Sequence, residues 1–493
     1  MTLVADTTGP KLDHVRTGRA SAALKGTIWS LVSSFTPAAV GFLVFLATSR
    51  ALTPAEFGIV AYAASIATIG LAISPAGFRE ALIQHKAIAP VHLDTVFWLS
   101  MVSGLVIYGG LCASAPFVAA QSGETLLLAL IPFISARVIF DMAAAVPNAL
   151  LVRTMSFRML AFRTSLASLA AAGICLGLLW LGFGVWALAA SQLAASAATC
   201  IGAMVASGWR PSLRFERAAL SDLRTFGLFS TGTHFITTLS IDQLLIGITL
   251  GPAGLGIYSF GRRIFQILTD LMSGALNLVS YSLLSSMQDE KAKLRQAFLF
   301  GTFASSIIAF PAFTGLALIA PDFVPFVFGD HWVEAVPVVQ AFCALGLLTA
   351  VGVLQSSLVR SQGQADIWFY YLLGKQVITV LYVWLFSGWG VEALTTAIVV
   401  QNYVMWLPTV FMVARLLGLS MAGYLASFAL PIFATMLMLV AGTFIQQQLA
   451  DAPTMLRLGA TIGGSALVYG AAVLVLGRRR LMEIGRLVRR RGG

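Results

Sequence analysis

Residues 52–59 read Leu-Thr-Pro-Ala-Glu-Phe-Gly-Ile, and residues 250–257 read Leu-Gly-Pro-Ala-Gly-Leu-Gly-Ile. Each segment ends one long apolar run and begins another. Two shorter pairs of segments also match: 184–188 with 390–394, and 151–153 with 358–360. Because the three offsets are 198, 206 and 207 residues, the chain repeats itself in almost one register. We therefore expect a duplicated bundle of helices, an organisation that is typical of membrane transporters.

The composition is that of a protein embedded in a lipid bilayer. Of the 493 residues, 58% are hydrophobic and only 10% are charged, whereas soluble domains carry about 25% charged residues. Apolar runs of about 20 residues recur along the chain, and each can cross a bilayer as a helix. These runs are continuous rather than alternating, so they predict helices and not barrel strands. All four cysteines lie inside apolar runs, so we expect neither a disulfide framework nor a metal site.

The apolar runs predict an all-α polytopic membrane protein with about fourteen transmembrane helices. The expected spans are 26–49, 57–78, 96–116, 126–147, 164–182, 185–206, 226–250, 255–282, 297–320, 337–358, 367–387, 391–412, 424–445 and 456–476. We expect two six-helix lobes, related by a pseudo-two-fold axis along the membrane normal, followed by two C-terminal helices.

The expected parts of the chain follow from these spans. They are an N-terminal segment (1–25), an N-lobe (26–206), a linker (207–225), a C-lobe (226–415), the last two spans (416–476) and a basic tail (477–493). The linker is basic and places Leu220, Leu223 and Phe226 at helical spacing. We expect it to lie as an amphipathic helix at the membrane surface.

The distribution of basic residues predicts the orientation of the chain. One alternating set of loops, together with both termini, contains 25 of the 31 Lys and Arg residues, whereas the other set contains only Arg50 and Arg457. Because basic loops stay on the cytoplasmic side, both termini are expected in the cytoplasm. The net charge of +11 is thus explained by topology, and we expect no nucleic-acid partner.

Charged residues inside the spans are the candidate functional residues, because a charge in the membrane usually marks a pathway or an ion pair. They are Arg137, Asp141, Asp242, Arg262, Arg263, Asp270 and Lys375. Each aligns with an uncharged residue in the other half of the repeat. The fold therefore does not require a charge at these places, which favours a function. Ion pairing is the alternative, and the three expected pairs are Arg137–Asp141, Asp242–Arg262 and Arg263–Asp270.

Four positive charges against three negative ones predict a mildly cationic cavity. Such a cavity suits a pyrophosphate or an acidic sugar, because Arg can bind these groups with two hydrogen bonds at once. The expected ligands of an anionic headgroup are Arg137, Arg262, Arg263 and Lys375.

Other residues are candidates for two further roles, coupling to an ion gradient and bending of a helix. Asp242 is the first candidate for coupling to a proton or sodium gradient, with Asp141 and Asp270 as further candidates. A structural pair of Asp242 with Arg262 is the alternative. Pro37 frees a backbone carbonyl in the first span, and it is either a hinge or an ordinary kink.

Several short segments resemble one known family. They are Arg50-Ala-Leu-Thr-Pro-Ala-Glu-Phe-Gly58, Ala81-Leu-Ile-Gln-His-Lys86, Thr95-Val-Phe-Trp98, Trp209-Arg-Pro211 and Ser240-Ile-Asp-Gln-Leu-Leu-Ile246. In this order they resemble the Wzx-type polysaccharide flippases, from the superfamily that also holds multidrug extruders and the MurJ lipid II flippase. The resemblance covers roughly residues 20–415, and the last two spans match only in number.

The resemblance implies that the chain moves a polyprenyl-pyrophosphate-linked oligosaccharide across the bacterial inner membrane by alternating access, for exopolysaccharide or O-antigen-type synthesis. It implies membrane lipids, a polysaccharide polymerase and glycosyltransferases as partners. The sequence shows no nucleotide-binding or zinc motif, so we expect no catalytic residue, no cofactor and no enzyme activity. A multidrug or cation antiporter of the same fold is the first alternative, and a membrane glycosyltransferase or polymerase is the second.

Overall fold

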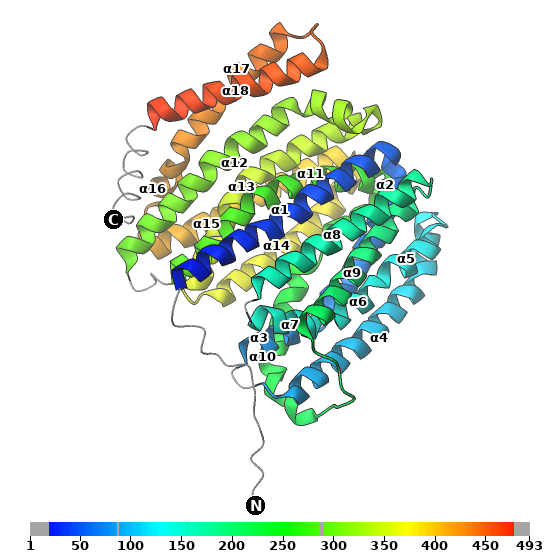
Figure 1. Cartoon of the computed structure of the whole chain (residues 1–493). Coiled ribbons are helices and arrows are strands. Elements are labelled where there is room, and N and C mark those ends of the chain that lie inside the picture. Colours follow the sequence, from blue (N-terminus) through cyan, green and yellow to red (C-terminus); the bar gives the residue numbers. More distant parts are fainter. Residues whose placement is uncertain (1–18, 86–87, 155, 286–289, 478–493) are drawn as a thin grey trace, which may run out of the picture.

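The computed structural model describes residues 19–85, 88–154, 156–285 and 290–477, with the backbone alone for residues 19–34, 157, 273–285 and 365. Every regular element in these ranges is a helix (Figure 1). The α-helices are α1 (Arg19–Ala51), α2 (Pro54–Ile73), α3 (Ala76–Gln84), α4 (Pro90–Ser122), α5 (Leu127–Ser135), α6 (Arg137–Ala143), α7 (Ala145–Arg153), α8 (Phe157–Trp180), α9 (Val185–Ser207), α10 (Arg217–Thr238), α11 (Ile241–Ser285), α12 (Lys291–Phe328), α13 (Val336–Ser361), α14 (Ala365–Phe386), α15 (Gly390–Leu417), α16 (Met421–Leu425), α17 (Ala429–Gln448) and α18 (Thr454–Leu476). Within the described residues, three short 3-10 helices accompany them: η2 (Asp330–Ala335), η3 (Ser387–Trp389) and η4 (Ala426–Phe428).

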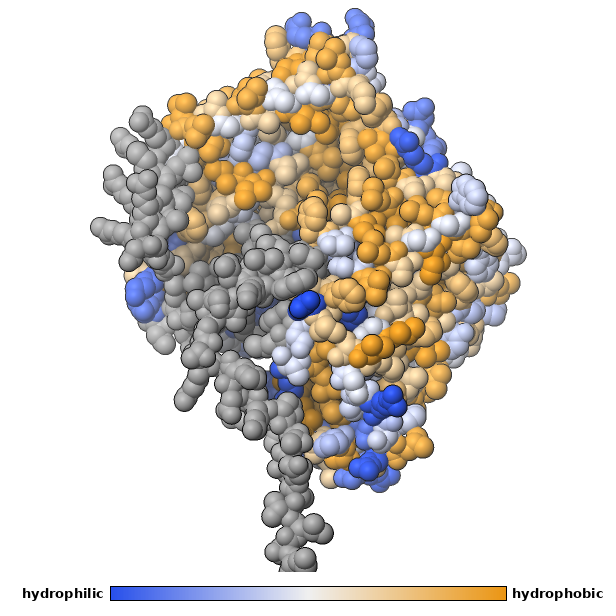
Figure 2. Space-filling view, in the orientation of Figure 1, coloured by the Kyte–Doolittle hydropathy of each residue, from blue (hydrophilic) through white to orange (hydrophobic). Residues whose placement is uncertain are grey.

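The surface of this bundle is apolar. Large hydrophobic side chains such as Val106, Phe117 and Leu467 are exposed, and Figure 2 shows hydrophobic residues over most of the visible face, with hydrophilic residues mainly near its edges. An apolar surface of this extent is stable in lipid and not in water. The expectation of an all-helical, multi-pass membrane protein is confirmed.

The number of crossings stays a prediction. Within the described residues, ten helical stretches are long and apolar enough to cross a membrane, and the count is eleven when the bent α5–α7 segment is included. The stretch Asp366–Leu417 contains two predicted spans, and the stretch Arg217–Met272 contains the span 226–250 and the first part of the span 255–282. All fourteen predicted ranges lie on helices, although four of them extend over a break between helices: 57–78, 126–147, 226–250 and 424–445.

The predicted fourth span, 126–147, is broken rather than straight. Its axis bends by 42° between Ala143 and Ala145. Pro147 lies directly after the bend and lacks the N–H that would bond to the carbonyl of Ala143, which explains the kink. The helix is also interrupted at Ala136, so α6 is a short helix that begins at Arg137.

The predicted linker, residues 207–225, contains a non-helical stretch and the beginning of a long helix, α10. Residues 208–216 are not helical, and α10 begins at Arg217 and continues to Thr238 without a separate surface helix before it. α10 packs against α3, where the N–H of Gly77 donates to Thr231 Oγ1 at 3.1 Å. Leu223 is buried in this contact. Leu220 packs against the same cluster, whereas Phe226 is exposed. The location of the linker at the membrane surface stays a prediction.

α11 is a hairpin of two helical arms, 241–250 and 252–285, joined at Gly251. Asp242 and Arg262 are 20 residues apart and form an ion pair of 2.5 Å, whereas a straight helix would separate them by about 30 Å. Gly251 makes the reversal with a φ of 70°, which favours glycine. Pro252 then begins the second arm, where the missing N–H of proline has no cost.

The two repeated segments of the sequence contact each other at one end of the bundle, which we call the outer end. A Cβ atom added to Gly58 of α2 would lie 1.7 Å from the carbonyl oxygen of Pro252, and one added to Gly256 of α11 would lie 1.8 Å from that of Pro54. The contact is reciprocal, because each glycine faces the proline of the other segment. A larger residue at either position would force α2 and α11 apart. The symmetry of the whole lobes stays a prediction.

Candidate functional site

A cavity of about 470 Å³ lies next to the outer-end contact, between α1, α2, α8 and α9 on one side and α11 on the other. Its wall combines small apolar residues with hydroxyl and amide side chains. Among the described residues of this wall, the charged ones are Arg262 and Arg263, and none is acidic. Pro37, the predicted hinge, also lines the cavity, on α1.

Arg262 is held by the hairpin of α11. Its Nη1 lies 2.5 Å from Asp242 Oδ2, and the hydroxyl of Tyr258 donates to the same oxygen at 2.6 Å. Gln243 Nε2 donates to Ser259 Oγ at 3.3 Å, one position further along both arms. Of the three expected ion pairs, Asp242–Arg262 is the one that forms among the described residues. The carboxylate of Asp242 lies behind Arg262 and outside the cavity wall.

Arg263 reaches across the cavity to the opposite wall. A Cβ added to Gly41 of α1 would lie 3.1 Å from Arg263 Nη2, so the guanidinium packs directly on α1. Asp270, its expected partner, is exposed two turns away and interacts with it only at longer range. In the described part of the chain, Arg263 forms no ion pair. It therefore contributes a positive charge to the wall that no direct contact neutralises.

Arg137 lies behind the cavity wall and not in it. Its Nη1 donates to Gln192 Oε1 at 3.0 Å, and Gln192 of α9 lines the cavity. Asp141, one turn along α6, lies within electrostatic reach of Arg137 and beside Ser196. The predicted pair Arg137–Asp141 is thus not in direct contact among the described residues.

Lys375 also lies outside the cavity wall. Its side chain on α14 is within electrostatic reach of Asp242, and the neighbouring Gln376 donates to the carbonyl of Leu239 at 3.3 Å. Gln401 of α15 donates to the carbonyl of Lys375 at 3.2 Å. The structure thus places Lys375 behind the Asp242–Arg262 pair, where it adds positive charge to the hairpin.

Sequence reasoning missed the amide side chains of the cavity. Gln192, Gln243 and Gln266 all line it, and all three fall inside predicted spans. The signal was present, because an amide in an apolar helix is also costly unless it is hydrogen-bonded. A prediction from charge alone does not identify these amides.

Five buried aromatic rings close the cavity at the outer end. They are Phe45 of α1, Phe57 of α2, Phe260 of α11, Phe328 of α12 and Trp332 of η2. The ring centroids of Phe260 and Trp332 are stacked 4.0 Å apart, and Phe57 meets Trp332 edge-on at 5.6 Å. Because these rings come from both sides of the cavity, they join the two groups of helices. We call these five residues the outer plug.

Hydrogen bonds at the rim fasten α1 over the outer plug. Trp332 Nε1 and His331 Nε2 donate to the carbonyl of Ser49 at 2.7 and 2.9 Å. Arg50 donates from Nε to the carbonyl of Val327 at 2.6 Å and from Nη2 to that of Phe326 at 3.2 Å. The last two acceptors lie at the C-terminal end of α12, where carbonyls lack helical partners and attract a cation.

Two further clefts lie beside α17 and are mainly apolar. One has a volume of about 460 Å³ between α12, α13, α15 and α17, and the other of about 490 Å³ continues along α12, α13 and α17. They share Thr314, Leu347 and Leu439. Arg457 of α18 fastens this region to α12 through two bonds to Asp322, of 2.9 and 2.5 Å.

Helices that enclose a polar, cationic cavity within an apolar surface define a membrane transporter as the class of protein. The sequence identifies the family. Residues 47–337, more than half of the chain, match the family described as "Polysaccharide biosynthesis protein". The chain belongs to this polysaccharide biosynthesis family.

Individual relatives agree with the family. The teichuronic acid biosynthesis protein TuaB of Bacillus subtilis is 23% identical, over 90% of this chain and 94% of its own. The lipopolysaccharide biosynthesis protein WzxC of Escherichia coli is 24% identical, over 87% and 89% of the two chains. The solved structure of the lipid II flippase MurJ, in an inward closed conformation, superposes with a TM-score of 0.77, at 12% identity, over 92% of this chain and all of that one. The fold is therefore that of MurJ.

Proposed function

We propose that this protein is a flippase that moves a polyprenyl-pyrophosphate-linked oligosaccharide from the cytoplasmic to the periplasmic leaflet by alternating access. The observation that carries the proposal is a cavity between two groups of helices that is closed at the outer end. Among the described residues of its wall, the charged ones are two adjacent arginines. The positive charge of these arginines, together with the amide side chains of the wall, suits a pyrophosphate and sugar oxygens. The names of the relatives support the proposal, because TuaB is named for teichuronic acid biosynthesis and WzxC for lipopolysaccharide biosynthesis.

Arg263 is the first candidate to bind the anionic headgroup. No side chain in the described part of the chain forms an ion pair with it, and its guanidinium lies between α1 and α11. Arg262 assists from the same wall, although Asp242 occupies part of its hydrogen-bonding capacity. Lys375 and Arg137 act at a distance, because neither lines the cavity.

The polyprenyl chain is accommodated by the two apolar clefts beside α17. Their shared residues make them continuous along α12 and α13. An apolar cleft that is open to the membrane lets a lipid chain stay in an apolar environment while its headgroup crosses.

We place the protein in the bacterial inner membrane with both termini in the cytoplasm, on the 25-to-2 division of basic residues between the loops. The outer end is then periplasmic. In the described conformation the cavity is closed on this side, so we infer that substrate enters from the cytoplasmic side. Glycosyltransferases would supply the lipid-linked substrate, and a polysaccharide polymerase would consume the product. The chain itself acts as a transporter and not as an enzyme.

Asp242 is the candidate for coupling to a proton or sodium gradient, although its contact with Arg262 also fits a structural ion pair. A flipping rate that is independent of pH and sodium would exclude coupling. The alternative of a cation antiporter is disfavoured, because the described residues of the cavity wall include no carboxylate that could attract a cation.

Deletion of the gene tests the proposal, because lipid-linked repeat units should then accumulate in the cytoplasmic leaflet and reach the periplasm again on complementation. Arg263→Gln should reduce flipping roughly ten- to a hundredfold, the range expected for hydrogen bonds to a charged group, at unchanged membrane abundance. Arg415→Gln is the matched control, because Arg415 is an exposed residue of α15 outside the cavity. A deletion strain that still presents repeat units in the periplasm would refute the function.

A further inference from the structure

The orientation of the Gln192 amide is determined by Arg137. A guanidinium has only hydrogen-bond donors, so the amide must turn its oxygen toward it. The 3.0 Å contact from Arg137 Nη1 to Gln192 Oε1 has this arrangement. The NH₂ group of Gln192 then points away from Arg137. Because Gln192 lines the cavity and the described residues offer no acceptor to its Nε2, the NH₂ group is open to the cavity.

The other polar side chains on the same side of the cavity do not offer a free donor. Their hydroxyl groups donate to carbonyls three or four residues earlier in their own helices. These residues are Thr48, Ser65, Thr68, Ser168 and Ser191. Such hydroxyls present lone pairs to the cavity. Among the described residues of α1, α2, α8 and α9 that line it, Gln192 is therefore the side chain with a free N–H donor.

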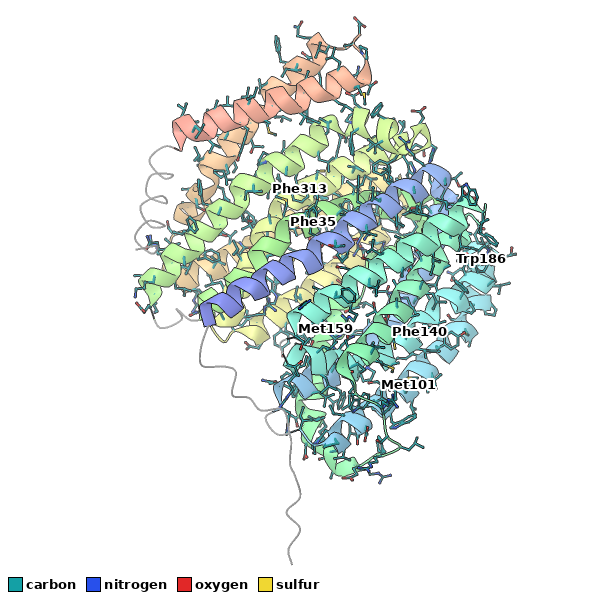
Figure 3. The ribbon with its side chains drawn as sticks, viewed as in Figure 1. Phe35, Met101, Phe140, Met159, Trp186 and Phe313 are labelled. Carbon is teal, nitrogen blue, oxygen red and sulfur yellow. The ribbon has the colours of Figure 1, made fainter. Side chains whose placement is uncertain are left out.

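The position of Gln192 is fixed from two sides. Trp186, at the start of α9 in Figure 3, packs edge-on against Phe133 of α5 with ring centroids 5.4 Å apart. Arg137 then holds the amide from α6, and Asp141 balances the charge of Arg137 from the next turn. Gln192 lines the same cavity as Arg262 and Arg263, so donors from both groups of helices meet in one cavity.

We propose that Gln192 is a substrate-specificity residue whose NH₂ group donates to an acceptor oxygen of the glycan headgroup, and that Arg137 and Asp141 are positioning residues that act through it. The inference rests on the proposed flippase function. It replaces the expectation that Arg137 itself binds the headgroup. A substrate held by Gln192 on one side and by the arginines of α11 on the other bridges the two groups of helices that must move during transport.

Flipping by the full chain in proteoliposomes, measured against substrate concentration, tests this assignment. Gln192→Met keeps the length of the side chain and removes the donor, and Gln192→Glu pairs with Arg137 and presents only acceptors. Both should raise the apparent KM roughly ten- to a hundredfold with a smaller change in the maximal rate. Gln376→Met is the matched control, since this amide bonds the backbone of Leu239 and lies outside the cavity wall. Its KM should change less than about twofold.

A double-mutant comparison separates positioning from direct binding. Arg137→Met combined with Asp141→Asn removes both buried charges together, so neither is left without its counter-charge. If Arg137 acts through Gln192, adding Gln192→Met to this variant changes the KM little further. Effects that multiply would show that Arg137 binds substrate itself and would overturn the positioning role. A stable Gln192→Met variant with wild-type KM would overturn the specificity role, whereas a wild-type protein that fails to flip would refute the proposed function instead.

Discussion

Replacing Gly58 with alanine should open the cavity at its outer end. The new Cβ would lie 1.7 Å from the carbonyl oxygen of Pro252, so α2 and α11 must separate by roughly 1.7 Å to reach an ordinary contact. Both atoms belong to rigid parts of the chain, and no side-chain rotation relieves the overlap. Overpacking of this kind costs about 1–3 kcal/mol. The upper value shifts the balance between outward-closed and outward-open forms by roughly a hundredfold.

Cysteine accessibility from the periplasmic side measures this shift. Thr68 lines the cavity, so Thr68→Cys, in a chain whose four natural cysteines are replaced, reports its exposure. A membrane-impermeant maleimide added outside should label this cysteine slowly in the parent and much faster with Gly58→Ala. Gly256→Ala should have the same effect because the contact is reciprocal, and the double variant should add little once the contact is lost.

Gly173→Ala is the matched control, because a Cβ at this position of α8 meets no atom within 4 Å. Gly58→Ala and Gly256→Ala variants that accumulate normally, and are labelled no faster than the Gly173→Ala variant, would refute the reasoning. Closure would then depend on the outer plug and on the hydrogen bonds of Arg50 to the end of α12 alone.

Two further predictions concern ion pairs that hold helices together. Asp242→Asn leaves Arg262 without its counter-charge, which should lower the free energy of unfolding by about 3 kcal/mol. In a thermal unfolding assay, the double variant with Arg262→Met should recover most of this loss. An unchanged melting temperature in the single variant would show that the pair is not structural. Asp322→Asn removes a bidentate, charge-assisted contact of Arg457 and should lower the free energy of unfolding by about 1–2 kcal/mol. Faster proteolysis of the loop between α17 and α18 would show this loss of stability, and wild-type protease resistance would contradict the prediction.

The described conformation is held closed by contacts of three kinds. Backbone touches backbone at Gly58 and Gly256, the five rings of the outer plug fill the space between the helix groups, and Arg50 and Trp332 fasten the rim. Opening must break all three, and each is individually modest in energy. A substrate that bridges Gln192 and Arg263 from within the cavity offers compensating contacts, which is how binding can shift the balance between two conformations.

The limits of sequence reasoning are clearest in the charged residues. The hairpin at Gly251 could be predicted from Leu250-Gly-Pro252, and with it the matching depth of Asp242 and Arg262, which form the expected pair. The same reasoning expected Arg137 to pair with Asp141 on one helix face. It could not anticipate Gln192, which is 55 residues away and approaches because α6 packs on α9.

The sequence by itself determined the membrane class, the helical segments, the reversal at Gly251 and the family, because apolar length, proline and glycine placement and local motifs act within one helix or one turn. The tertiary structure decided which charges reach the cavity and which lie behind it, and that the repeated glycines face each other. Helical periodicity gives the depth and the face of a residue. Which neighbour that face meets depends on how helices far apart in the chain pack, and this is what makes Arg263 a wall residue and Arg137 a support for Gln192.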